Sequence, residues 1–330
     1  MRKHSMMRSR KSMYFTVVTI AFLFIFTFVF LAQNYRQLGE KMGVVEMRVL
    51  SMNDFVKDIE RDSERGLYIS SYRALLALEE YIITNGTFLS DVENSFREAI
   101  FNGTVQNQSS YFMSESTLPL WIEKIEDEAA NFNIGLEITP GNLTVYQKDP
   151  WHVRIGANFS FALNDTSAIA SWQRDTYIEA SLSLIGFEDP LYIIYSYGRI
   201  SNNLNATPYE NNFTYDSGGQ IKVSNLLDHL NHSYYSANPA APSFLMRLKN
   251  DLGPSPYGIE SMVDLLKLSK QGLNIDEDSS IIDYYYWQGS SNGDYRVNQT
   301  PSWFKIDYAH LQKYNASSIS CQIGSPGCNI

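Results

Sequence analysis

The sequence contains few cysteines and few charged residues, and its first 118 residues contain no proline. Cys321 and Cys328 are the only cysteines among 330 residues, fewer than a large animal-type ectodomain usually carries, and their spacing excludes a CxxC metal or redox site. Charged residues make up 19% of the chain and aromatic residues 14%, a composition too apolar for a disordered protein. We therefore expect a folded chain with room for long, uninterrupted helices before Pro119.

Basic residues are scarce as well, and they are unevenly distributed. The net charge is −10 and the pI about 5.0, which excludes the basic footprint of a nucleic-acid-binding protein. Of the 26 basic residues, five lie in residues 1–32, which contain no Asp or Glu. The other 21 share the rest of the chain with all 36 acidic residues. We expect no nucleic-acid partner, and the asymmetry points to a membrane topology.

Residues 13–32 form a run of twenty positions without a charge, Asn, Gln, Gly or Pro. As a helix they span about 30 Å, the thickness of the hydrocarbon core of a bilayer. Because the run is apolar on every face, a transmembrane helix is favoured over a buried core helix. The cations before it predict a cytoplasmic leader over 1–12 and an extracellular remainder, in a cell-membrane protein that crosses the bilayer once. A cleaved secretory signal is the alternative, although residues 31–34 fit a small-x-small cleavage site badly.

Asn-x-Ser/Thr sequons give an independent indication of topology, because a glycan is added only outside the cytoplasm. The chain has eleven, against about four expected by chance, and all lie beyond the apolar run. The candidate glycosylation sites are Asn85, Asn102, Asn107, Asn142, Asn158, Asn164, Asn205, Asn212, Asn231, Asn298 and Asn315. They predict a glycoprotein at the cell surface.

An apolar seam continues the helical signal beyond the membrane run. Its members recur at alternating steps of four and three residues: Leu38, Met42, Val45, Val49, Met52, Val56 and Ile59. The pattern predicts one helix over 13–62, a possible bend or end at Gly66, and further helix over 68–83, so that 33–83 form an amphipathic stalk. The seam has two candidate partners, the protein's own outer domain and the same helix of another copy.

The outer part, residues 84–330, is predicted to be an α+β domain. Helices are expected over 91–100 and 118–132, with a polar linker over 102–116 between them. Alternating apolar residues then predict four antiparallel strands over 134–138, 143–145, 153–163 and 178–184, with a turn at 140–142. Further along, we expect short helices over 223–232, 257–271 and 306–314 and a strand over 281–287. Whether this part is one domain or two stays open.

The two cysteines stand at the C-terminal end in CQIGSPGC. Outside the cell they can oxidise, and Gly324, Pro326 and Gly327 supply a turn that brings them together. A Cys321–Cys328 disulfide is the favoured interpretation, and two free or intermolecular thiols are the alternative.

Sequence motifs of catalysis are few. The chain has no Walker loop, no GxGxxG and no GxSxG elbow, and no cofactor is expected. His229 and His232, three residues apart on an expected helix, could both face a metal, but they lack the HExxH spacing. The leading hypothesis is therefore a non-enzymatic surface protein. The alternative is an extracytoplasmic hydrolase or metal-dependent enzyme that uses these two histidines.

A short cationic leader ending in Lys11-Ser12, followed at once by a twenty-residue apolar helix that continues as an amphipathic one, resembles the archaeal type IV pilin class. The resemblance covers about the first 65 residues, and beyond it the chain is similar only to uncharacterised archaeal membrane-anchored surface proteins. It implies cleavage between Ser12 and Met13, a filament core built from the apolar helix, and copies of this chain or other pilin-like subunits as partners beside the lipid bilayer. Val17 stands where many pilins have glutamate. The implied role is a pilin-like filament subunit or an adhesion module.

Overall fold

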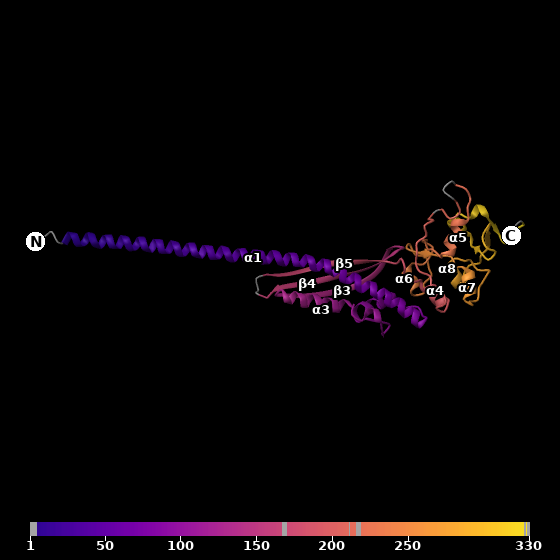
Figure 1. The fold of residues 1–330 in the computed structure, drawn as a ribbon, viewed down its shortest axis with the longest axis horizontal. Coiled ribbons are helices and arrows are strands. Elements are labelled where there is room, and N and C mark those ends of the chain that lie inside the picture. Colours follow the sequence, from indigo (N-terminus) through magenta and orange to yellow (C-terminus); the bar gives the residue numbers. More distant parts are fainter. Residues whose placement is uncertain (1–4, 167–169, 211, 216–218, 327, 329–330) are drawn as a thin grey trace.

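The computed structural model describes residues 5–166, 170–210, 212–215, 219–326 and 328, with only the backbone given for 5–13 and 38–41. One very long helix projects from a head in which helices pack on antiparallel sheets, so the predicted α+β class is confirmed (Figure 1). The N-terminus lies at the free end of the helix, and the C-terminus lies at the opposite end of the molecule (Figure 1).

Helix α1 (Ser5–Asn85) is a single element of 81 residues, about 120 Å long. The expected end near residue 62 and the interruption at Gly66 are wrong, because the helix continues through both. Gly66 is needed there for another reason: a Cβ atom at this position would lie 2.5 Å from two ring atoms of Trp121. The missing side chain lets the indole ring of α3 (Leu118–Asn131) approach the backbone of α1.

The main sheet has three long antiparallel strands in the order β3 (Ile134–Asp149), β4 (His152–Asp165) and β5 (Ser171–Ser183). The prediction of four strands is wrong because the expected turn at 140–142 is a bulge within β3. The register shifts between Pro140 and Leu143, and Leu143 then pairs with Ala157. Since β3 is an edge strand, Pro140 can lie in it without removing an essential ladder hydrogen bond.

Alternate residues of the sheet face a core that α1 and α3 cover. Helix α1 packs on β5, and α3 packs on β3. Helix α2 (Val92–Asn102), which Asp91 caps, lies beside α1. From Met52 onward, α1 is itself part of this core, since Met52, Val56 and Ile59 are buried in it.

The segment predicted as a polar linker is more ordered than expected. It forms a two-residue hairpin between β1 (Thr104–Val105) and β2 (Gln108–Ser109), followed by the 3-10 helix η1 (Tyr111–Met113). Gln106 and Asn107, at the turn, both have left-handed backbone, with φ angles of 47° and 65°. Asn tolerates this conformation better than most residues, so the turn forms without glycine.

The distal lobe, defined as the described residues from 190 onward, has a second core of its own. Its helices are α4 (Pro190–Tyr195), α5 (Ser224–Asn231), α6 (Phe244–Arg247), α7 (Leu265–Lys270), α8 (Asp283–Gln288), α9 (Tyr308–Lys313) and the 3-10 helix η2 (Ser317–Ile319). Its short strands are β6 (Ser236–Ala237), β7 (Ile259–Glu260), β8 (Tyr295–Val297), β9 (Lys305–Ile306) and β10 (Ser320–Gln322). They form two small antiparallel sheets, β6-β7 and β10-β8-β9.

Two predictions for the distal lobe are wrong. The expected strand over 281–287 is helix α8, because the buried carboxylate of Asp283 accepts hydrogen bonds from Ser261 and Arg247 and thereby fixes the start of a helix. Helix was also expected over 257–271, but only α7 forms, after strand β7. In both places long-range contacts override local propensity. Helices α5 and α9 lie where they were predicted.

Candidate functional site

From Tyr14 onward, the part of α1 outside the head is apolar and exposed as far as the structure describes its side chains. From Tyr14, α1 includes an 18-residue window with a mean hydropathy of 2.6, none of it buried. The hydroxyls of Thr19 and Thr27 donate to the carbonyls of Phe15 and Leu23, at 2.8 and 2.5 Å, which satisfies them within the helix. The segment is thus long and apolar enough to cross a bilayer, and it projects away from the head (Figure 1).

The predicted leader junction between Ser12 and Met13 lies inside α1, on backbone that is helical on both sides. Leu38, the first residue of the seam, is among those whose side chains the structure does not describe.

Between this apolar segment and the head, α1 exposes further apolar side chains. Val44 is 58% and Met47 66% exposed, and so are the seam residues Met42 (66%) and Val45 (41%), whereas Met52 is fully buried. We call residues 42–50 the neck. The seam is therefore divided: from Met52 it packs on the protein's own head, whereas in the neck Met42 and Val45 are exposed and Val49 is half-buried.

Arg48 marks the place where α1 meets the head. Its guanidinium lies 2.7 Å from the carboxylate of Asp165, which is almost fully buried at the end of β4. The same guanidinium donates to the backbone carbonyls of Phe132 and Asn133, at 3.2 and 3.1 Å. Because these groups lie at the end of α3 and of the sheet, Arg48 joins α1 to the head at this point.

All eleven sequon asparagines lie at the surface of the head. Nine are exposed, and Asn212 and Asn315 are half-buried. On the central strand β4, Asn158 and Asn164 point away from the core, because buried residues alternate with them. Asn142 lies in the neighbouring bulge of β3. Side-chain exposure is compatible with glycosylation at every candidate asparagine.

The two candidate metal ligands have different surroundings. His229 is completely buried, its Nδ1 lies 3.0 Å from the Thr207 hydroxyl, and burial lowers its pKa to about 3, so its ring is neutral. His232 is exposed at the end of α5, stacks on Tyr234, and lies 3.1 Å from the carboxylate of Asp228. The structure does not bring the two rings to a common open site. Within the described ranges, no group of three or more His, Cys, Asp and Glu side chains could hold a metal.

A third histidine, His310, lies at the centre of a buried charge network that the sequence did not reveal. Its Nδ1 lies 2.7 Å from Asp307 Oδ2, and its Nε2 lies 3.1 Å from Glu260 Oε2. The other oxygen of Glu260 is 2.9 Å from Lys313 Nζ and accepts a 2.9 Å hydrogen bond from Tyr314. Each charge in the network thus faces an opposite charge.

The pKa values of His310 and Glu260 favour their charged forms. Burial alone would lower the pKa of His310, but its hydrogen bonds to Asp307 and Glu260 outweigh burial and raise the pKa to about 9. Burial would raise the pKa of Glu260, but His310 and Lys313 lower it to about 2. A catalytic general base needs a pKa near neutrality and access to substrate, and His310 has neither. The network is best understood as structural. The only local signal for it is the Asp307–His310 spacing, in which Asp307 caps α9.

Glu79 is another buried acidic group. Burial raises its pKa to about 8, although the backbone N–H of Glu188 donates to it at 2.7 Å and opposes the shift. It lines a shallow pocket of about 340 Å³, together with Glu80 and Glu188, between the end of α1 and the chain that follows β5. At neutral pH Glu79 is mainly protonated, which removes one charge from this acidic pocket.

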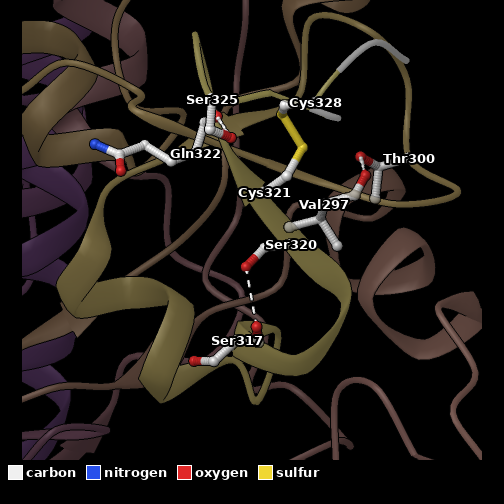
Figure 2. Close-up of a disulfide and its surroundings, with 8 residues drawn as sticks. All are labelled: Val297, Thr300, Ser317, Ser320, Cys321, Gln322, Ser325 and Cys328. Carbon is white, nitrogen blue, oxygen red and sulfur yellow. Dashed lines mark hydrogen bonds between the residues drawn. A yellow bond between two sulfur atoms is a disulfide. The ribbon is translucent and has the colours of Figure 1, made fainter.

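The two cysteines form the predicted disulfide. Their Cα atoms are 5.5 Å apart, and the bond joins β10 to the chain end (Figure 2). Cys321 pairs in the sheet with Arg296 of β8. Thr300, the hydroxyl residue of the Asn298 sequon, belongs to the surroundings of the disulfide (Figure 2).

The chain matches no protein-family model, no curated protein and no solved structure. Inferences about function therefore depend on its own residues.

Proposed function

We propose that this chain is a single-pass membrane protein that presents a glycosylated, non-enzymatic α+β head outside the cell. Its N-terminus would be cytoplasmic, and the free part of α1 would be its anchor. The observation that carries the proposal is the continuity of α1: one helix is exposed and apolar after Tyr14 and is part of the core of the head from Met52 onward. Such a continuous helix would connect the head rigidly to the membrane in which its free end would lie.

The charge distribution and the positions of the sequons support this orientation. Five cations precede the apolar run, and every sequon asparagine lies after it, on the surface of the head. Protease added to intact cells should remove the head, and deglycosylation should lower its mass. A head that is protected in intact cells and digested only in opened ones would contradict the orientation.

We further propose that α1 associates with α1 of other copies or of pilin-like subunits, which would make the protein a filament subunit. The neck supports this, since its exposed Val44 and Met47 lie outside the length of a bilayer and remain unpartnered in the single chain. Mass spectrometry of the mature N-terminus tests the processed form of the proposal. A chain that begins at Met13 is expected. A chain that retains Arg2 to Ser12 would leave a plain signal anchor that carries an adhesion module.

A further inference from the structure

The sequons differ in how exposed their third residue, the Ser or Thr, is. The transferase recognises the hydroxyl of the third residue of Asn-x-Ser/Thr, so this hydroxyl must be reachable together with the asparagine. In three sequons of the head the asparagine is at the surface but the third residue is buried: Thr207, Thr214 and Ser233 are 6%, 1% and 6% exposed. These residues belong to the sequons of Asn205, Asn212 and Asn231, and all three lie in the distal lobe.

Each of the three residues is held in place by the folded lobe. The hydroxyl of Thr207 lies 3.0 Å from Nδ1 of the buried His229. The hydroxyl of Thr214 donates to the backbone carbonyl of Asn315 at 2.6 Å, which joins segments 101 residues apart. Lys267 Nζ donates to the Ser233 hydroxyl at 3.4 Å. Exposing any of these hydroxyls to an enzyme requires the surrounding lobe to open.

Other sequons are reachable in the folded head. Asn107 lies at the tip of the β1–β2 hairpin, and its third residue, Ser109, is exposed. Asn142 lies in the bulge of the edge strand β3, and its third residue, Thr144, is exposed as well, although its hydroxyl donates to the carbonyl of Gly156 at 3.1 Å. These two sites provide an internal comparison within the same molecule.

We infer that Asn205, Asn212 and Asn231 accept glycans only before the distal lobe folds, whereas Asn107 and Asn142 can also accept them afterwards. The inference rests on the proposed extracellular location of the head. The reaction joins Nδ2 of the asparagine to the anomeric carbon of a lipid-phosphate-linked sugar and breaks the bond from that carbon to the phosphate oxygen. The amide proton passes to the transferase, and the phosphate leaves with the lipid.

The test uses the full chain, produced without glycans and kept in detergent, either folded or unfolded in urea and diluted at once into the reaction. Both forms receive an oligosaccharyl transferase and a lipid-linked donor, and mass spectrometry measures occupancy at each site. In the folded chain, occupancy at the three distal sites should be about tenfold or more below that at Asn107, because modification has to wait for the lobe to open. In the unfolded chain, all five sites should be comparable. Equal occupancy in the folded chain would overturn the inference.

A variant that loosens the lobe provides a second readout. Arg247→Ala, which removes a buried cation of the distal lobe, should raise occupancy at the three sites relative to Asn107. Lys249→Ala, a change at a half-exposed residue of the same segment, should leave the ratio unchanged. If R247A leaves the ratio as low as K249A does although its lobe is shown to be loosened, the inference is wrong. A native protein that carries no glycan at any sequon would instead count against the proposed location, while the ratios measured in vitro would stand.

Discussion

The guanidinium of Arg247 lies 2.6 Å from the carboxylate of Asp189, and neither side chain is exposed to solvent. The same Nη1 atom lies 2.8 Å from Asp283, so one cation joins α6, α8 and the residue that caps α4. Arg247 also donates to the carbonyl of Ile259, and Tyr235 donates to Asp189 at 2.8 Å. The burial that would lower the pKa of Arg247 is outweighed by the two carboxylates, which raise it. The distal lobe is thus built around a paired, desolvated charge.

Replacing Arg247 with Met should destabilise the distal lobe by about 3–5 kcal/mol, because it leaves Asp189 and Asp283 buried without a cation. Urea denaturation followed by tryptophan fluorescence measures the loss. The triple variant R247M/D189N/D283N should recover part of it, since it no longer buries an uncompensated charge. A triple variant less stable than R247M would contradict this electrostatic explanation.

The stability of the head should depend on the ionisation of His310. Its pKa is raised from 6.5 to about 9 in the folded protein, so the charged form contributes fully below pH 6.5, and the contribution is lost as the pH rises through about 9. We expect the free energy of unfolding to fall by about 2–3 kcal/mol between pH 6.5 and pH 9 on this account. His310→Asn should be less stable at pH 6.5 and should lack this slope. Denaturation curves of the unmodified protein and of His310→Asn at several pH values test this expectation. An identical pH dependence of the two free energies of unfolding would show that His310 does not cause it.

Changes in the neck should affect assembly without affecting folding. Val44→Asp combined with Met47→Asp alters two side chains that no part of the head covers, so the melting temperature of the head should stay the same. Each apolar side chain that a partner helix would bury is worth about 1.5–3 kcal/mol, so association of the full chain in detergent should be lost. Val56→Asp is the contrasting variant, because Val56 lies in the core and the change should unfold the head. Association that survives V44D/M47D would exclude the neck as an interface.

Gly66 and Gly43 form a matched pair within α1. Gly66→Ala should cost about 1–3 kcal/mol, because the new Cβ would lie 2.5 Å from the Trp121 ring. Gly43→Ala meets nothing within 4 Å and should stabilise the helix by about 0.5–1 kcal/mol. Thermal unfolding of the two variants should shift in opposite directions. Shifts of the same sign and size would mean that the contact with Trp121 does not determine the choice of glycine.

Loss of the disulfide should weaken the C-terminal end of the distal lobe. Replacing both Cys321 and Cys328 with serine should lower the free energy of unfolding by about 2–3 kcal/mol, the value that loop-closure entropy gives for so short a loop. Reduction of the unmodified protein should produce the same loss, which separates the effect of the bond from that of the substitutions. Unchanged stability in both experiments would show that the bond does not contribute to the lobe.

The sequence by itself determined the features that depend on local patterns. Three local patterns each predict a helix or a strand: the run of twenty apolar residues, the steps of four and three that follow it, and the alternation in residues 153–163. Such patterns lie in neighbouring residues because each face of a helix or strand must match the water, lipid or core that it meets. The α+β class, helices α2, α3, α5 and α9, and the disulfide followed from such patterns.

Tertiary structure alone decided the features that depend on distant partners. The seam is buried in the core of the head only from Met52, because the sheet and α3 end near Arg48. Residues 281–287 become helical around Asp283 because Arg247, 36 residues earlier, neutralises its carboxylate. His310 and Glu260, 50 residues apart, become an ion pair only when the fold excludes water from both. Such pairings leave no periodic trace in a sequence, since their energy arises from burial and geometry that exist only after the chain has folded.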